Sequence, residues 1–247
     1  MKVHSTYNVK VFQTIDTLNI AAANLIIEIA NKAIKERGRF LISLSGGQTP
    51  VQLYSLLTQP FFSNQIPWEK TFVFWGDERC VASSDERNNA HQAKSILLDR
   101  IDIPTSNIYP IPVSLSPSQA AAEYEKELKI FFGKGPMKFD LVLLGLGENG
   151  HTASLFPGMK VIDEQAEGIR EVYLKDEKMH RVTMTAPLIN QAHNVLFLVT
   201  GGEKAMVLEK VLTTSYQPDE YPAQLIKPVN GELYWFIDQA SASLINI

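Results

Sequence analysis

The sequence contains a single cysteine, Cys80, in 247 residues, so no disulfide can form within the chain. Such cysteine usage is typical of a reducing compartment, and a cytoplasmic location is predicted. No run of about 18 uncharged apolar residues occurs, which argues against a transmembrane helix. The first residues, MKVHSTYNVKVF, lack the apolar core of a secretory signal. We therefore expect no membrane partner.

Clusters of positive charge are also absent. The chain carries 23 Lys and Arg against 27 Asp and Glu, a formal net charge of −4, and its basic residues are scattered. An extended nucleic-acid surface needs basic residues gathered on one face, so no nucleic-acid partner is expected. A small anionic ligand needs only a few cations brought together locally, and the charge balance leaves such a partner open.

The motifs of several enzyme classes are missing. The sequence has no G-x-S-x-G nucleophile elbow, no P-loop G-x-x-x-x-G-K-[ST] and no H-E-x-x-H zinc motif. The other histidines have no ligand spacing, and no metal is expected. Cys80 follows the mixed-charge triplet Asp77-Glu78-Arg79 rather than a positive cluster, which favours a partly buried, unreactive thiol.

The apolar segments predict an α/β fold with a doubly wound, mostly parallel sheet. Nearly continuous apolar runs alternate with amphipathic helices, the pattern of a sheet covered by helices on both faces. Helices are predicted over 17–37, from Pro50 with Thr49 as N-cap, over 86–99, and after the capping-box residues 116–119. The predicted strands are RFLISL (39–44), TFVFW (71–75), FDLVLLG (139–145), NVLFLVTG (194–201) and ELYWFID (232–238), with NIYPI (107–111) and EVYL (171–174) as edge strands. Without repeats or linkers, residues 1–247 are predicted to form one domain.

Four polar clusters directly follow predicted strands: SGGQTP (45–50), GDER (76–79), GENGH (147–151) and TGGEK (200–204). The carboxyl ends of parallel strands meet at one edge of a sheet, where open α/β sheets bind their ligands. We therefore expect the four clusters to converge on one site.

The third cluster lies in LVLLGLGENGHTASLFPG (141–158), where Gly145, Gly147 and Gly150 form the pattern G-x-G-x-x-G after a strand. This pattern is typical of dinucleotide-binding loops, which also need a long following helix and an acidic residue after the next strand. Pro157 limits any such helix to two turns, and no acidic residue is suitably placed. The glycines are better explained as backbone that closely approaches a ligand, and no cofactor is expected.

The segment LGLGENGHTASLFPG (144–158) resembles the signature of 6-phosphogluconolactonases. The resemblance continues in order along the chain through SGGQTP, WGDERCV (75–81), NNAHQA (88–93), RVTMTAPLIN (181–190), FLVTGGEKA (197–205), PAQLI (222–226) and WFID (235–238). It implies a Rossmann-like, sugar-phosphate-binding fold shared with glucosamine-6-phosphate deaminases. The implied activity is hydrolysis of 6-phospho-D-glucono-1,5-lactone to 6-phospho-D-gluconate, the second step of the oxidative pentose phosphate pathway. A monomer or a homodimer is expected, and the sequence does not decide between them.

At two positions the sequence differs from the pattern of a related family: Phe156 departs from the deaminases and Asn149 from most lactonases. Deaminases resemble G-H-I-A-F-N-E-P, with a glutamate five residues after the histidine, and this chain has Phe156 there. The lactonases commonly carry aspartate where this chain has Asn149, which keeps the shape of aspartate but cannot act as a carboxylate base. The lactonase interpretation is favoured, and a deaminase-like enzyme and a non-catalytic sugar-phosphate sensor are the alternatives.

His151 is the predicted general base, because the pKa of histidine lies near neutrality and the resemblance implies the same role. A residue that caps a short helix is the alternative. The backbone of the SGGQTP segment, at the start of a helix, suits an anion, although a plain Gly-rich turn has the same sequence.

The resemblance implies that Arg181 and Lys204 bind phosphate and that Asp77 and Arg79 face the sugar. Arg79 is left with two roles, a bond to phosphate or polarisation of the lactone carbonyl, while Glu78 is expected to be structural. The complete prediction is His151 and Asp77 for catalysis, and Ser45, Gly46, Gly47, Thr49, Arg79, Asn149, Gly150, Arg181 and Lys204 for substrate and phosphate.

Overall fold

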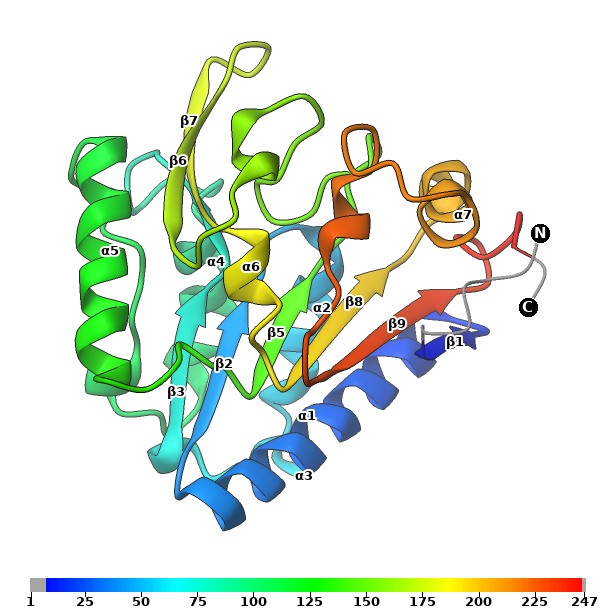
Figure 1. Ribbon diagram of the computed structural model, residues 1–247. Helices are drawn as coiled ribbons and strands as arrows, with labels where there is room; N and C mark the ends of the chain where they lie inside the picture. Colours follow the sequence, from blue (N-terminus) through cyan, green and yellow to red (C-terminus); the bar gives the residue numbers. More distant parts are fainter. Residues whose placement is uncertain (1–7, 246–247) are drawn as a thin grey trace.

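A computed structural model describes residues 8–245 as an α/β fold around a six-stranded sheet (Figure 1). Residues 1–7, within which no secretory segment was expected, lie outside the described residues. All neighbouring strands of the sheet pair in parallel, in the order β1-β9-β8-β5-β2-β3, which confirms the predicted fold class. Their bounds are β1 Asn8–Phe12, β2 Phe40–Leu44, β3 Thr71–Trp75, β5 Leu141–Leu144, β8 Asn194–Val199 and β9 Glu232–Asp238.

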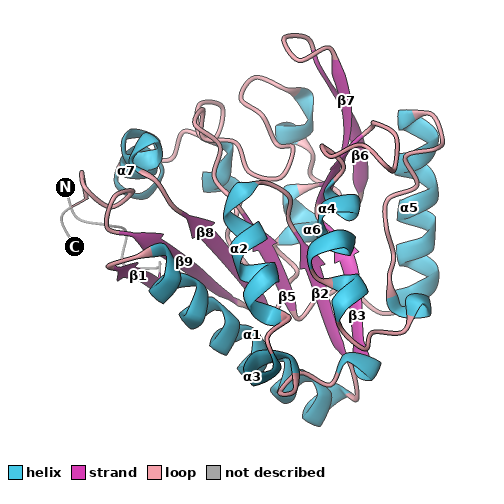
Figure 2. Ribbon diagram, turned by 180° about the vertical axis from the view of Figure 1, so that it is seen from behind, coloured by secondary structure: helices cyan, strands magenta, loops and turns pink. Residues whose placement is uncertain are grey.

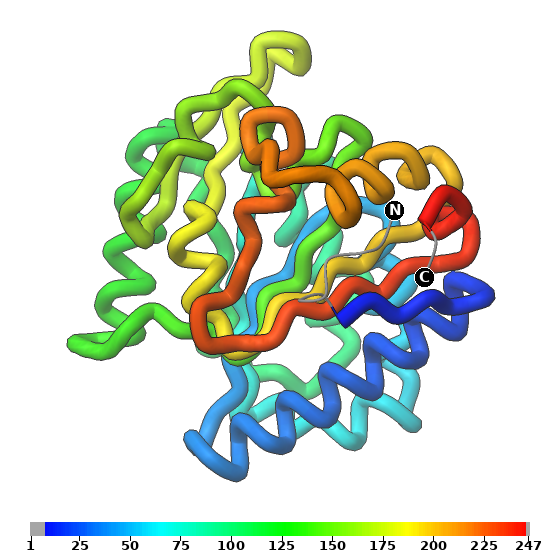
Figure 3. Tube along the Cα trace, turned by 45° about the vertical axis from the view of Figure 1, so that its right-hand side comes forward, coloured from blue at the N-terminus to red at the C-terminus, as the bar shows by residue number. Residues whose placement is uncertain are grey.

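Helices cover both faces of this sheet. Helices α1, α2 and α4 lie on one face, and α5 and α6 lie on the other (Figures 1 and 2). Helix α7 lies on the opposite side of the sheet from α1 (Figure 3). None of the helices described is long and apolar enough to cross a membrane. The bounds are α1 Ile15–Arg37, α2 Gln48–Leu57, α3 Pro60–Ser63, α4 Asn89–Ile96, α5 Pro117–Phe132, α6 Ala186–Ile189 and α7 Ala205–Thr213.

A second, antiparallel sheet of order β4-β7-β6 extends beyond the carboxyl end of β3 (Figure 1). It consists of β4 Asp77–Arg79, β6 Ile169–Leu174 and β7 Met179–Met184. The segment EVYL is therefore a strand, but it belongs to this sheet rather than to an edge of the main one. NIYPI forms only a bridge between Ile108 and Val73, and Pro110 has no N–H with which to extend it.

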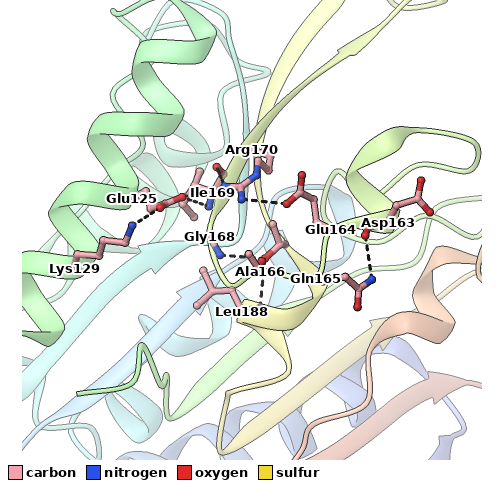
Figure 4. A network of polar contacts seen from close by, with 11 residues as sticks. Glu125, Lys129, Asp163, Glu164, Gln165, Ala166, Gly168, Ile169, Arg170 and Leu188 are labelled. Atoms are coloured by element: carbon pink, nitrogen blue, oxygen red, sulfur yellow. Dashed lines mark hydrogen bonds and ion pairs between the residues drawn. The ribbon is translucent and has the colours of Figure 1, made fainter. Parts of the chain in front are cut away.

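The β6–β7 hairpin is anchored at its base to α5 (Figure 4). The Glu125 carboxylate accepts hydrogen bonds from the Ile169 N–H, at 2.9 Å, and from Arg170 Nη1, at 3.1 Å. Arg170 also forms an ion pair with Glu164. These contacts fix the base of the hairpin, whose other end extends beyond the carboxyl edge of the main sheet (Figure 1).

Local sequence signals explain most helix boundaries. Thr14 and Ser116 begin α1 and α5 with capping boxes, the second as predicted. Asn88 caps α4, which is shorter than the predicted 86–99. The prediction that Thr49 is an N-cap is wrong. Helix α2 begins at Gln48, and its N-cap is Gly47, whose φ of 102° suits glycine alone.

Candidate active site

A cleft of about 530 Å³ opens at the carboxyl edge of the main sheet, and all four polar clusters contribute to its lining. This confirms the expected convergence, because each cluster follows a parallel strand or its continuation. The predicted site residues that line it are Ser45, Gly46, Gly47, Thr49, Asp77, Arg79, His151, Arg181 and Lys204. Asn149 and Gly150 do not line the cleft but contact or adjoin residues that do.

The imidazole of His151 is held on two sides. Its Nδ1 lies 2.6 Å from Asn149 Oδ1, and its ring stacks on Phe156 with centroids 4.0 Å apart. The same Asn149 oxygen accepts the His151 backbone N–H at 3.3 Å, which identifies it as an acceptor. Nδ1 therefore carries the proton, and Nε2 keeps its lone pair.

Burial lowers the pKa of His151 to about 4, and the nearby cations Arg181, Lys204 and Arg79 act in the same direction. The ring is thus uncharged at neutral pH. A neutral imidazole with a fixed tautomer can accept a proton at Nε2, which is what a general base requires.

Two glycines of the cleft let neighbouring side chains lie directly against the backbone. A Cβ on Gly147 would lie 2.0 Å from the His151 ring, and a Cβ on Gly46 would lie 1.8 Å from Asn89 Oδ1. Gly150 has a φ of 81° and lies against Tyr221, while its carbonyl accepts the Ala223 N–H at 3.0 Å. The PAQLI segment therefore supports the loop that carries His151.

Arg79 and Arg181 face each other across the β4–β7 pair. Directly opposed residues of an antiparallel pair project on the same face, and like charges there are unfavourable. The Nε atoms of both guanidinium groups are buried without a hydrogen-bond partner. Lys204, just before α7, adds a third cation to the cleft lining. This arrangement suits an anion that accepts bonds from the arginines.

Asp77 is buried beside the arginines and held in place. Its Oδ2 accepts a hydrogen bond from Ser154 Oγ at 2.7 Å, and its backbone carbonyl accepts one from Asn89 Nδ2 at 2.9 Å. Glu78 points away into the start of α4, where the N–H groups of Asn89 and Ala90 donate to its carboxylate. It does not line the cleft, in agreement with the structural role expected for it.

The loop between β2 and α2 forms another wall of the cleft. The Tyr54 hydroxyl donates to the Ser45 carbonyl at 2.7 Å and accepts the Ser45 N–H at 3.1 Å, which fixes the start of the loop. Thr49 does not cap the helix but contacts the Thr200 hydroxyl at 3.1 Å. This contact joins the first cluster to the fourth.

Sequence reasoning assigned no role to several residues that build the site. Ser154, Phe156 and Asn89 lie inside the motifs that carried the resemblance, yet no residue pattern reports their contacts. Ser154 bonds to Asp77, 77 residues away in the chain, while Phe156 stacks on His151 and Asn89 bonds to the Asp77 backbone. Burial raises the pKa of Cys80 to about 11, which agrees with an unreactive thiol. The described residues contain no group of three or more His, Cys, Asp or Glu side chains that could hold a metal ion.

The fold and the cleft define a Rossmann-like α/β protein with three cations in the lining of a cleft at the carboxyl edge of its sheet. The family model described as glucosamine-6-phosphate isomerases/6-phosphogluconolactonase matches residues 13–235, and the chain belongs to this family. A 6-phosphogluconolactonase of Synechocystis is 45% identical over 213 residues, which are 84% of this chain and 85% of that protein. One of Nostoc is 40% identical over 228 residues, 91% and 92% of the two chains.

Solved structures agree with this assignment. The 6-phosphogluconolactonase from Trypanosoma cruzi superposes with a TM-score of 0.86 at 27% identity, covering 100% of this chain and 99% of that one. A monomeric glucosamine-6-phosphate deaminase has a TM-score of 0.81 at 21% identity, covering 96% and 99%. The second likeness shows the fold alone.

Proposed function

We propose that this protein is a 6-phosphogluconolactonase, which hydrolyses 6-phospho-D-glucono-1,5-lactone to 6-phospho-D-gluconate. The observation that carries the proposal is the meeting of two features in one cleft. An uncharged histidine with a free Nε2 lies beside three cations, Arg79, Arg181 and Lys204. The reaction requires a base for water, a group that stabilises the oxyanion and a holder for phosphate, and these residues offer candidates for all three functions.

In the proposed reaction, His151 Nε2 removes a proton from a water molecule as the water oxygen attacks the lactone carbonyl carbon. A tetrahedral oxyanion forms, and the histidine becomes an imidazolium. When the oxyanion collapses, the bond between the carbonyl carbon and the ring oxygen breaks, and the imidazolium returns its proton toward that oxygen. The released acid loses its own proton to solvent. General-base help of this kind contributes roughly 10²–10⁴ in rate.

We assign the phosphate to the cations and the sugar to Asp77. Because Ser154 occupies Oδ2 of Asp77, Oδ1 is the oxygen proposed to accept a sugar hydroxyl. The proposed backbone contacts come from Ser45, Gly46, Gly47 and Thr49, and Gly150 shapes the loop. The two roles open to Arg79 separate kinetically. Arg79→Gln raises KM alone if Arg79 binds phosphate, and it lowers kcat if Arg79 polarises the carbonyl.

Deamination of an amino-sugar phosphate is disfavoured by Phe156. Its ring stacks on His151, where the deaminase-like pattern would place a glutamate. An aromatic ring can neither donate nor accept the proton that ring opening needs. Ammonia release from glucosamine 6-phosphate would contradict the lactonase assignment.

The direct test measures acid release from freshly generated lactone. The wild type should exceed the spontaneous rate, and His151→Ala should lose most of that excess. His193→Ala is the matched control, because His193 lies at the other end of the sheet, beside Asn194 and Gly231, and it should retain full activity. No acceleration by the wild type, together with tight binding of 6-phosphogluconate, would identify a sensor instead.

The single lactonase domain over residues 1–247, the cytoplasmic location and the monomeric or homodimeric state remain predictions. Sedimentation of the purified protein measures the oligomeric state directly, and fractionation of cells that express the tagged chain measures its location.

A further inference from the structure

The turn that joins β6 to β7 places a carboxylate on one of the phosphate-binding cations assigned above. Lys175, Asp176, Glu177 and Lys178 form this turn, and Lys178 has a φ of 49°. Glu177 Oε2 lies 2.6 Å from Arg181 Nη2, four residues along the chain. The carboxylate therefore occupies a donor of the guanidinium that a phosphate would use.

The two partners differ in their freedom to move. The Arg181 side chain is 10% exposed, and its guanidinium lies over the Phe156 ring with its Cζ 5.3 Å from the ring centroid. Its backbone is paired with β4 on one side and β6 on the other. The Glu177 side chain is 44% exposed on a turn. Glu177 can rotate into water at little cost, whereas Arg181 is fixed by packing and pairing.

A phosphate dianion and the Glu177 carboxylate cannot both remain on Arg181 without strong repulsion. We propose that Glu177 is an internal competitor of the substrate, a carboxylate that neutralises Arg181 in the empty cleft and is displaced by phosphate. Glu177 is thus a specificity-determining residue, because a ligand must offer Arg181 a stronger anion than a carboxylate. The inference rests on the proposed function, which makes Arg181 a phosphate ligand.

A weaker pair of the same kind involves Lys204, another cation of the cleft lining. Glu148 Oε1 is 3.6 Å from Lys204 Nζ, and the Glu148 side chain is 72% exposed. The longer distance and greater exposure make this pair a minor competitor. The principal effect should therefore come from Glu177.

The test compares Glu177→Gln with Asp176→Asn. Both variants remove one negative charge from the same exposed turn, but only Glu177 contacts a cation of the cleft. The probe is 6-phosphogluconate, titrated calorimetrically, with inorganic phosphate as a second probe. Glu177→Gln should bind both about three- to fivefold more tightly than the wild type, while Asp176→Asn should change the affinity by less than about 1.5-fold.

A double-mutant cycle ties the effect to Arg181. In an Arg181→Gln background the gain from Glu177→Gln should disappear, because the competition acts through that guanidinium. Equal affinities of Glu177→Gln and Asp176→Asn, or weaker binding by Glu177→Gln, would overturn the inference. Lactone hydrolysis by the wild type would then leave the proposed function intact. Conversely, if the variants show the expected affinities but the wild type does not hydrolyse the lactone, the competition by Glu177 is supported and the proposed lactonase function is wrong.

Discussion

Asn149 Oδ1 accepts the Nδ1 proton of His151 across 2.6 Å. The amide fixes the tautomer as a carboxylate would, but it carries no charge with which to stabilise an imidazolium. The low pKa of His151, about 4, is therefore opposed by no carboxylate at Nδ1. The aspartate expected at this position by resemblance would give the same geometry and a different titration.

Asn149→Asp should raise the pKa of His151. A negative charge in contact with the ring favours the imidazolium, by about one to two pKa units. Since the base must be unprotonated, the wild type should keep its kcat/KM down to nearly pH 4, and the variant should lose activity at a higher pH. The measurement is kcat/KM for the phosphorylated lactone between pH 4 and pH 7.5.

Asn230→Asp adds the same charge at the other end of the sheet, just before β9, and serves as the control. At acidic pH, the kcat/KM of this control variant should fall over the same pH range as that of the wild type. If the kcat/KM of Asn149→Asp also falls over the same pH range as that of the wild type, His151 is not the group whose protonation limits the reaction.

Gly147→Ala should displace the His151 ring, the proposed base, without unfolding the protein. The new Cβ would lie 2.0 Å from two atoms of the imidazole, whereas a Cβ on Gly145 would meet nothing within 4 Å. We expect kcat to fall about 10²-fold or more in Gly147→Ala, because a misplaced base loses most of its effect. Gly145→Ala should lose far less. Similar melting temperatures for the two variants, with equal kcat values, would contradict this role of Gly147.

The main sheet could be predicted from the sequence more completely than strands β4 and β7, which carry Arg79 and Arg181. Apolar runs such as TFVFW marked five of the six strands of the main sheet, because a strand buried on both faces is apolar along its length. The edge strand β1 has no fully buried residue and was not predicted. Strands β4 and β7 were not predicted: β4 is three residues long, and β7 includes the polar residues His180 and Arg181. Their pairing depends on contacts between segments about a hundred residues apart, which no local pattern reports.

The same distinction applies to the cleft. Its four clusters were predictable because strand polarity places them at one edge. Arg79 lies opposite Arg181 because of the register of β4 against β7. The hydrogen bond from Ser154 to Asp77 depends on the fold of the loop that carries His151. Sequence analysis predicted Arg79, Arg181 and Asp77 as site residues, but it could not predict which of their atoms lie close together.

Arg181→Gln should weaken binding of the phosphorylated lactone far more than it slows the reaction. Loss of a charge-assisted bond to phosphate raises KM about 10- to 100-fold, and hydrolysis of unphosphorylated glucono-1,5-lactone should hardly change. Lys175→Gln is the control, since this lysine is an exposed cation of the turn of the same hairpin and does not line the cleft. A similar loss for both lactones would mean that Arg181 does not hold the phosphate.

Glu78→Gln should change how stability depends on pH. Burial outweighs three backbone donors and raises the pKa of Glu78 from about 4.5 to about 7 in the folded protein. The folded state then binds more protons than the unfolded state between these values, so this group's contribution to stability is lost as pH rises from about 4.5 to about 7. Glutamine does not titrate. The free energy of unfolding of the wild type, relative to that of the variant, should fall by on the order of 2–3 kcal/mol between pH 5 and pH 7.5.

Urea denaturation at the two pH values measures this difference, with the exposed Glu69→Gln as control. A difference that stays constant would mean that Glu78 is ionised throughout, with its backbone donors offsetting its burial.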